Sequence, residues 1–467
     1  MKKYFKKTIF CLTFLSGFLM CQNAQAADKY VVRGATGTGA SWADAMEMPA
    51  RGSESICNFD VETWTKGDTY WIAGSDMAYG EICFRNTTGS GTITLKKATT
   101  DSHGTDTGWS ADYGTKQAVL GAIGNQGVSD VVIDGSTGSG RSGYGFKIIG
   151  NTGSNSFAIS WQSGSTHNNL TVNYAEITSP TEPISDGCID GNTCTAAGIY
   201  LHNVTGASLE NLWIHDVALP YHVITPTNFV VKDSIVERND STDAHHSEAF
   251  SFVGGTNVVI NNNDFVDIEG TGVFAFMNYG TANGVKIYNN IIRYTTDATQ
   301  TGLGNGIFTC TNNNTICNNV EYYNNTQVNP KGINAMIDIG AGGAASTWIV
   351  KNNIWWCADG VVCAPASNEV SDQITYDNNW YGGVTYNSSE NGAIYQATEN
   401  PFIDAVNYDF ALGANATAIN AGTDLSAIFT TDFLGNTRSG VWDIGAYEYV
   451  GSADVIAPAA PSGLAVI

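Results

Sequence analysis

One short run of the chain concentrates the side chains that can transfer protons. The run ERNDSTDAHHSE, residues 237–248, contains two adjacent histidines and ends on a glutamate. A histidine beside a carboxylate titrates near neutral pH and can act as a general acid or base. We therefore interpret one group of residues as candidate catalytic groups: His245, His246, Glu248 and Glu269. A second group consists of candidate substrate contacts: His222, Arg238, Asp243 and Tyr221.

A β-eliminating lyase is the first chemistry that this run could support. Such an enzyme needs a base that removes the C5 proton of a sugar and a cation that neutralises the uronate. The chain offers His245, His246 or Tyr221 as the base. It offers Arg238 or Lys232 as the cation.

An inverting glycoside hydrolase is the second chemistry. It needs two carboxyl groups roughly 6.5–9.5 Å apart, and four acidic residues of adjacent repeats could supply the pair: Asp243, Glu248, Asp267 and Glu269. Two alternatives involve no reaction. The protein could be a glycan-binding or cell-surface spacer, and the run could be a solvated acidic loop whose histidines bond locally.

The N-terminal residues have the pattern of a secretory signal peptide. Four lysines precede an apolar stretch from Thr8 to Met20, and Ala24-Gln25-Ala26 supplies the small residues that a signal peptidase needs. We expect cleavage after Ala26 and a secreted, periplasmic or cell-surface protein without membrane insertion. Loss of the four lysines and of no acidic residue changes the formal net charge from −23 to −27.

Such an acidic chain lacks the basic surface that nucleic acids and anionic membranes require, so neither is an expected partner. The charge also argues against unassisted capture of a polyanionic glycan. Bound calcium could reverse the charge locally, because clustered carboxylates are the ligands that this cation prefers.

The cysteine pattern predicts disulfides. Cys11 and Cys21 belong to the predicted signal peptide, which leaves eight of the ten cysteines for an oxidising compartment. Although the sequence leaves the connectivity open, the spacing favours four pairs: Cys57 with Cys83, Cys188 with Cys194, Cys310 with Cys317, and Cys357 with Cys363. A zinc site is the alternative, but the chain has neither a C-x-x-C pair nor a histidine spaced to complete one.

A repeat with a period near 28 residues runs through the second half of the chain. Each copy has alternating β-branched or aromatic residues, then two asparagines, then an apolar residue, as in VKIYNNII (285–292) and WIVKNNIW (348–355). The aligned positions are separated by 29, 27, 35, 28 and 26 residues: Asp233, Asn262, Asn289, Asn324, Asn352 and Asn378. Asparagine tolerates a left-handed conformation at a sharp bend and can bond to its copies in adjacent coils. This predicts a solenoid of stacked β-coils.

A second short strand precedes several copies, as in EAFSF (248–252), GVFAF (272–276) and GIFTC (306–310). Alignment of these strands places five aromatic residues in one column, which we interpret as core packing: Tyr200, Tyr221, Phe250, Phe274 and Phe308. The same alignment brings His222 and Glu269 to the histidine run, because stacked strands lie about 5 Å apart. An antiparallel β-sandwich is the alternative fold, but it needs neither a regular period nor stacked asparagines.

These repeats resemble the right-handed parallel β-helix superfamily that includes pectate lyases. The opening YVVRGATGTGASWADAM (30–46) and the closing DFLGNTRSGVWDIGAYEY (432–449) are similar to the first and last coils of such proteins. The resemblance implies fold and a polysaccharide ligand, and it leaves the activity open. Lyases of this superfamily generally use Lys or Arg as base in a basic or calcium-loaded cleft. Neither a lyase motif nor the polygalacturonase Asn-Thr-Asp, Asp-Asp and Gly-His-Gly signatures are present.

The sequence therefore predicts an all-β chain with a single right-handed parallel β-helix. We expect a signal peptide at 1–26, an N-terminal cap with the first coils at 27–130, and regular coils at 131–384. C-terminal coils and a cap follow at 385–450, and a linker-like tail at 451–467. The expected function is binding, with cleavage as a lyase or hydrolase, of an extracellular polysaccharide. The alternative is a non-catalytic cell-surface, adhesin-like or structural β-helix.

Overall fold

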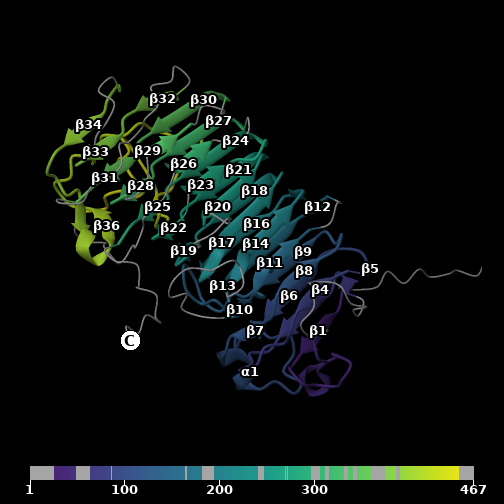
Figure 1. Ribbon diagram of the computed structural model, residues 1–467. Helices are drawn as coiled ribbons and strands as arrows, with labels where there is room; N and C mark the ends of the chain where they lie inside the picture. Colours follow the sequence, from purple (N-terminus) through teal and green to yellow (C-terminus); the bar gives the residue numbers. More distant parts are fainter. Residues whose placement is uncertain are drawn as a thin grey trace, which may run out of the picture.

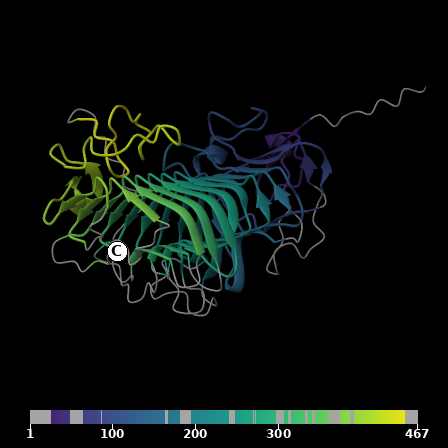
Figure 2. The ribbon, with the colours of Figure 1, turned by 90° about the horizontal axis from the view of Figure 1, so that it is seen from above.

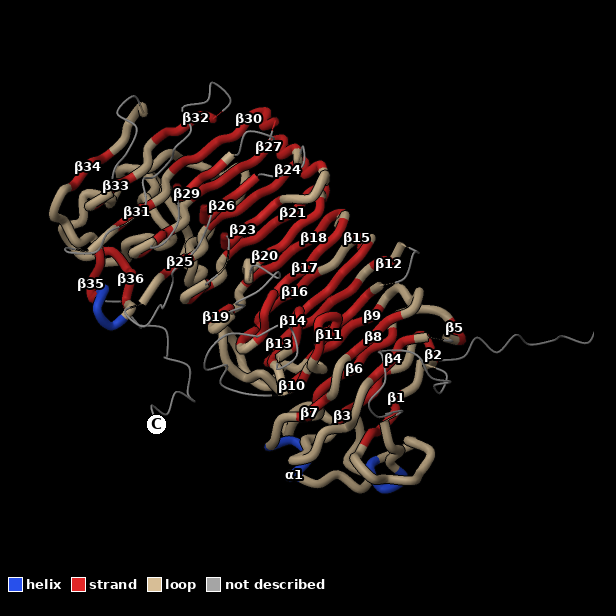
Figure 3. Tube along the Cα trace, in the orientation of Figure 1, coloured by secondary structure: helices blue, strands red, loops and turns tan. Residues whose placement is uncertain are grey.

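The protein is a parallel β-helix whose coils stack from the N-terminal to the C-terminal end (Figure 1). The computed structural model describes residues 26–48, 64–85, 87–162, 166–180, 194–239, 247–268, 270, 272–295, 306–310, 315–330, 335–339, 344–358, 363, 374–384 and 390–451. Within these ranges strands dominate and helices are short (Figure 3). The predicted all-β solenoid is confirmed.

Each regular coil contributes strands to three faces. The first face contains parallel strands that lie before the asparagine turn: β1 (Asp28–Val31), β3 (Thr69–Ile72), β6 (Ile93–Lys97), β9 (Val131–Asp134), the first parts of β13 (Leu170–Thr178) and β16 (Ser208–His215), β18 (Thr227–Lys232), β21 (Gly255–Asn261), β24 (Thr281–Tyr288), β27 (Ile316–Tyr323), β30 (Ala344–Lys351) and β32 (Ile374–Asp377).

The second face continues the same sheet after that turn. Its strands are β7 (Ala118–Leu120), β10 (Phe146–Ile149), the last parts of β13 and β16, β19 (Ile235–Glu237), β22 (Asp264–Val266), β25 (Ile291–Arg293), β28 (Thr326–Val328), β31 (Ile354–Trp356), β33 (Trp380–Gly382) and β34 (Ile394–Gln396).

The third face is a separate parallel sheet. It contains β4 (Ile82–Phe84), β8 (Ile123–Asn125), β11 (Gly153–Trp161), β14 (Thr195–His202), β17 (Val217–Ile224), β20 (Phe250–Val253), β23 (Gly272–Phe276), β26 (Gly306–Cys310) and β29 (Ala335–Asp338). The remaining elements lie around the coils: β2 (Thr65–Lys66), β5 (Thr88–Gly89), β12 (His167–Asn168), β15 (Val204–Thr205), β35 (Phe402–Asp404), β36 (Asp409–Leu412), α1 (Ala111–Thr115), and the 3-10 turns η1 (Trp42–Asp44) and η2 (Ala405–Asn407).

The aromatic column of the core is confirmed for four of its five predicted members. Tyr221, Phe250, Phe274 and Phe308 are in register on consecutive strands of the third face and are buried. Tyr200 was wrongly placed, because it is in register with His222 and not with Tyr221. Successive strand residues point to opposite sides, so this difference of one residue moves Tyr200 to the outer side of the sheet.

The predicted turn residues have the left-handed conformation. All six aligned positions, from Asp233 to Asn378, have φ between 47° and 56°. Asparagine and aspartate adopt this conformation at low cost compared with β-branched residues. The sharp bend between the first and second faces is therefore encoded locally in each repeat.

The continuous hydrogen-bond ladder belongs to the second asparagine of each pair. Asn263, Asn290, Asn325 and Asn353 are fully buried, and each donates from its side-chain amide to the carbonyl oxygen of the next coil's asparagine over 2.9–3.1 Å. Asn379 ends the ladder by donating to Glu390 over 2.8 Å. The predicted stacking between coils is present at some aligned positions, since Asn262 donates to Asp233 over 3.3 Å and Asn352 donates to Asn324 over 3.1 Å. The continuous ladder lies one residue further along.

The C-terminal segment lies along one side of the coils (yellow in Figure 2). Several turn asparagines donate to its backbone carbonyls, including Asn324 to Asp443 and Gly445 over 2.9 and 3.0 Å. Asn352 likewise donates to Thr423 over 2.8 Å. We call residues 413–449 the C-terminal clasp. A second apolar cluster between the second face and this part of the chain includes Trp356, Trp380 and Phe402, so the tryptophans here pack in the interior.

Two of the four predicted disulfides are present in the described residues. Cys310 bonds with Cys317, and Cys357 bonds with Cys363. Cys83 and Cys194 are also disulfide-bonded, and the partners predicted for them, Cys57 and Cys188, lie outside the described residues. Among the residues that the structure describes, no helix is both long and apolar enough to span a membrane.

Candidate functional site

The predicted site residues fall into two groups. His245, His246, Asp243 and Glu269 lie outside the described residues, so their roles stay predictions. The other four are described, and they do not gather at one point of the surface.

Three of these four residues lie on or beside the third face. Tyr221 is 0% exposed and stacks on Phe250 with 4.4 Å between ring centroids, so it fills the core and does not fit the predicted contact with substrate. Glu248 is buried just before β20. His222 is partly exposed, and its ring stacks on that of Tyr200 at 5.1 Å on the outer side of the sheet.

Arg238, the fourth residue, belongs to a larger group of charged side chains. It lies directly after β19, where the chain passes from the second face to the third. Its guanidinium donates to Asp216 from Nε over 3.2 Å and from Nη2 over 3.0 Å. It also donates to Glu237. Arg238 and Asp216 both have left-handed φ values, 48° and 55°, which mark them as the corner residues of adjacent coils.

The charges continue across β10, β13, β16 and β19. We call the group the corner cluster, and it consists of Lys147, Glu176, Trp213, His215, Asp216, Glu237 and Arg238. Parallel register explains its assembly, because Lys147 lies opposite Glu176, Glu176 opposite Trp213, and His215 opposite Glu237 on neighbouring strands. Residues distant in the sequence therefore lie one strand spacing apart.

Glu176 is the acceptor on the N-terminal side of the cluster. Its carboxylate accepts from Lys147 Nζ over 2.8 Å and from Gln117 over 2.9 Å. The Nε2 atom of His215 lies 3.5 Å from the same carboxylate. These donors outweigh burial, which alone would raise the pKa of Glu176, and together they lower that pKa to about 2.

His215 connects the two halves of the cluster. Its imidazole is 1% exposed, and Nδ1 lies 2.5 Å from the Asp216 carboxylate while Nε2 faces Glu176. Burial by itself lowers the pKa of His215, but the hydrogen bond with Asp216 and the nearby Glu176 carboxylate outweigh burial and raise the pKa above its ordinary value. The charges therefore alternate in sign from Lys147 to Glu237 when His215 is protonated.

The cluster reaches the surface through its cations and one indole. The Lys147 and Arg238 side chains are 23% and 36% exposed. Trp213 is partly exposed, donates from its indole to Glu237 over 3.0 Å, and lies 6.1 Å from the ring of Tyr144. Indole faces and paired cations can contact the apolar faces and the oxygen atoms of sugars.

A second arginine–carboxylate pair lies further along the second face, beyond the corner cluster. Arg293 binds Asp264 over 3.0 and 3.1 Å and stacks on Tyr408 at 4.7 Å. Tyr408 is 46% exposed. Alternating arginine and carboxylate side chains with an exposed tyrosine thus continue beyond β19.

Sequence reasoning identified Arg238 and missed Lys147, Glu176, His215 and Asp216. Their signal is present only in part. Lys147 and Glu176 are charged positions within apolar strands, as in FKII (146–149), and such positions must point outward. Which charges become neighbours depends on register in coils that lack the Asn-Asn pair, and these coils escaped the repeat alignment.

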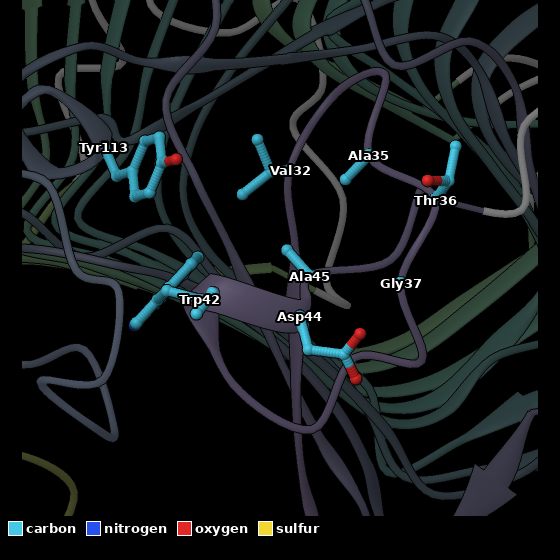
Figure 4. Close-up of a pocket in the computed structure, with 9 residues that line it drawn as sticks. Val32, Ala35, Thr36, Gly37, Trp42, Asp44, Ala45 and Tyr113 are labelled. Atoms are coloured by element: carbon cyan, nitrogen blue, oxygen red, sulfur yellow. The ribbon is translucent and has the colours of Figure 1, made fainter.

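A separate cavity of about 370 Å³ lies near the N-terminal end (Figure 4). It is lined by Val32, Ala35, Thr36, Gly37, Trp42, Ala43, Asp44, Ala45 and Tyr113. Trp42 is buried, and the Asp44 carboxylate already accepts from the Thr38 hydroxyl. The carboxylate that lines this cavity is therefore already hydrogen-bonded within the protein. The corner cluster is the stronger candidate for a functional site.

The described ranges contain no group of three or more His, Cys, Asp or Glu side chains arranged to hold a metal ion. The corner cluster itself satisfies its carboxylates with lysine, histidine and arginine. A calcium requirement stays a prediction.

Comparison with known proteins gives similarity at the level of structure. No protein-family model and no curated protein matches the chain. The crystal structure of pectate lyase Pel9A is similar over 91% of this chain and 97% of that chain, with a TM-score of 0.50 and 16% identity.

Two alginate lyases match with lower scores. The one from Paenibacillus sp. strain FPU-7 has a TM-score of 0.30 and 11% identity, over 66% of this chain and 92% of that chain. AlyGC, of the PL6 family, has a TM-score of 0.32 and 12% identity, over 84% and 57%. The stacked parallel faces and the match to Pel9A agree with the predicted architecture: the chain has the right-handed parallel β-helix, pectin-lyase-like fold.

Proposed function

We propose that this protein binds a polysaccharide across the corner cluster and cleaves it. The observation that carries the proposal is the position of Trp213, a partly exposed indole in the same cluster as two partly exposed cations, Lys147 and Arg238. Sugar rings stack on aromatic faces, and arginine and lysine donate to hydroxyl or carboxylate oxygens. The name of Pel9A, a pectate lyase on the same fold, supports a polysaccharide ligand.

For the reaction, we propose the residues of the histidine run. His245 and His246 follow Arg238 by only seven and eight positions in the sequence. One of them would transfer the proton, with Glu248 and Glu269 as carboxylates. His222 and Asp243 are proposed as further substrate contacts.

A panel of polysaccharides tests this proposal. Pectate, alginate and the neutral glucan dextran are incubated with the protein, with and without added calcium, while ultraviolet absorbance and new reducing ends are followed. Both signals together indicate a lyase, and reducing ends alone indicate a hydrolase. Binding without either signal supports the non-catalytic alternative, and neither binding nor cleavage contradicts the proposal.

Two substitutions then separate binding from cleavage. Trp213→Ala should weaken binding of the active polysaccharide about tenfold, since one sugar-stacking face is lost, whereas His245→Ala should abolish cleavage and keep binding. Unchanged cleavage in both His245→Ala and His246→Ala would remove these histidines from the mechanism.

We also propose that the protein is exported. The disulfides Cys310–Cys317 and Cys357–Cys363 support an oxidising compartment, and the N-terminal pattern supports a cleaved signal. N-terminal sequencing of the protein from its culture should begin at Ala27, and an intact Met1 would contradict cleavage.

A further inference from the structure

The imidazole of His215 lies between two carboxylates, a position in which only a protonated ring is attracted on both sides. Its two nitrogens face the carboxylates of Asp216 and Glu176, at 2.5 and 3.5 Å. An imidazolium carries a proton on each nitrogen, whereas a neutral imidazole carries one and turns a lone pair toward the other partner. Loss of the proton therefore replaces an attraction with a repulsion at one carboxylate.

Other charged and polar groups face this ring from every strand around it. Glu176 and Thr178 come from β13, and the Thr178 hydroxyl lies 3.4 Å from Nδ1 of His215. Glu237 lies opposite His215 in the register of β19, and the Trp213 ring lies 4.2 Å from the imidazole. Lys147 on β10 and Arg238 after β19 complete the surroundings through the two carboxylates.

We propose that His215 is a pH-dependent positioning residue that joins Glu176 to Asp216 and thereby holds Lys147 and Arg238 in place on the surface. This inference rests on the proposed function for its consequence, since these two cations are the proposed glycan contacts. The link itself is a property of the free protein. Protonated His215 balances the cluster, because three cations face three carboxylates. Neutral His215 leaves it with one excess negative charge.

The direction of the pH effect follows from the raised pKa of His215. The link is complete below the ordinary histidine value near 6.5 and is lost as the pH rises through the higher value in the folded protein. Above that pH, Arg238 should become more reactive toward reagents, and affinity for an acidic glycan should fall about threefold to tenfold.

Chemical labelling of the full-length protein measures the link without a ligand. The extent of phenylglyoxal modification of Arg238 is measured by peptide mapping at a series of pH values from 5 to 9. At each pH it is divided by the extent of modification of Arg33. Arg33 is a matched reference, because its side chain is 38% exposed against 36% for Arg238, and it also has a carboxylate partner, Glu47. The ratio should rise about threefold across the titration of His215 and stay flat in His215→Gln.

Two further variants keep the test decisive. Glu176→Gln removes the second carboxylate that faces His215, so the rise in the Arg238 to Arg33 ratio should be smaller in this variant than in wild type. This variant can be measured even if His215→Gln does not fold. His103→Gln is the control. His103 lies outside the corner cluster and pairs with Asp106, with 2.8 Å between Nε2 and the carboxylate, so this variant should show the same rise in the ratio as wild type. A rise of equal size in wild type and Glu176→Gln would overturn the proposal, as would a flat ratio in wild type.

Pectate affinity, measured over the same pH range, separates this inference from the proposed function. If pectate binds and its affinity falls with rising pH in wild type but not in His215→Gln, both are supported. If pectate binds at no pH, its proposed binding fails, and the labelling ratio still decides the role of His215.

Discussion

At the scale of single residues, the corner cluster shows how a buried charge is stabilised by its partners. The Glu176 side chain is 10% exposed, and a buried carboxylate would be costly without donors. Lys147, Gln117 and His215 supply them and lower the pKa of Glu176 to about 2. A depressed pKa in the folded state contributes stability above the unfolded value near 4.5, and this stability is lost as the pH falls from about 4.5 to about 2.

Glu176→Gln should therefore destabilise the protein at neutral pH by roughly 3 kcal/mol, which is the linked energy of that pKa difference. The destabilisation should shrink as the pH falls and largely vanish near pH 2, where about half of the wild-type carboxylate is protonated as well. Urea unfolding at a series of pH values measures both.

A matched control lies on the first face of the same sheet. Glu210 pairs with Lys232 over 3.0 Å, but both side chains are substantially exposed, so Glu210→Gln should cost less than about 1 kcal/mol. Equal losses at Glu176 and Glu210 would argue against a special role for the corner cluster.

At the scale of elements, the asparagine pairs divide two tasks between neighbouring residues. The first asparagine provides the left-handed bend, and its side chain is available to bind the C-terminal clasp. The second is buried and links adjacent coils: Asn325, for example, donates to Asn353 and to the Ile287 carbonyl and accepts from Asn290. Removal of one buried amide leaves several partners unsatisfied at once.

Asn325→Ala should destabilise the protein by about 3 kcal/mol, because each unsatisfied buried group costs about 1–3 kcal/mol. Urea unfolding of the full chain measures the change. Asn283→Ala is the control, since Asn283 is exposed and its amide accepts from Asn319 at the outside of the coils. We expect less than about 0.5 kcal/mol there, and a similar loss in both variants would contradict a dominant role for the inner ladder.

At the scale of the whole molecule, the C-terminal clasp covers one side of the coils, and a buried arginine attaches it to them. Arg438 is 4% exposed. Its guanidinium donates to Glu448 over 2.8 Å, to the carbonyls of Gly445 and Ala446 over 2.9 and 3.0 Å, and to the side chain of Asn289 over 3.1 Å. One side chain thus joins the clasp to a turn of the β-helix.

The clasp also contacts the loop that joins β9 to β10. Arg141 stacks its guanidinium on the ring of Phe433 at 3.8 Å and donates to the carbonyl of Asn262. The clasp and this loop lie on the same side of the stacked coils (Figure 2). The clasp therefore connects coils that are not sequential neighbours.

Arg438→Met should destabilise the protein by about 3–5 kcal/mol, because it leaves Glu448 buried without its cation. Limited proteolysis should then cut within residues 413–449 before the coils. Arg438→Lys should recover only part of the loss, since one ammonium lacks the planar fork that reaches all these acceptors. Arg33→Met, at an exposed pair, should change neither measurement appreciably, and unaltered proteolysis in Arg438→Met would contradict the role of the clasp.

The sequence by itself determined the coil period, the left-handed turns and most of the aromatic column. These features depend on local preferences that recur in every repeat: asparagine tolerates the bend, and alternating apolar residues fill the core. The two described disulfides followed from short spacing for the same reason, since their partners are six or seven residues apart.

Only the tertiary structure decided which charges become neighbours. Lys147, Glu176, His215 and Arg238 belong to four successive coils of unequal length, and strand register alone brings them together. A shift of one residue reverses the side on which a side chain lies, as the position of Tyr200 shows. Composition and spacing carry no information about that register where the asparagine pair is missing, so the candidate site emerged from the stacking of the coils.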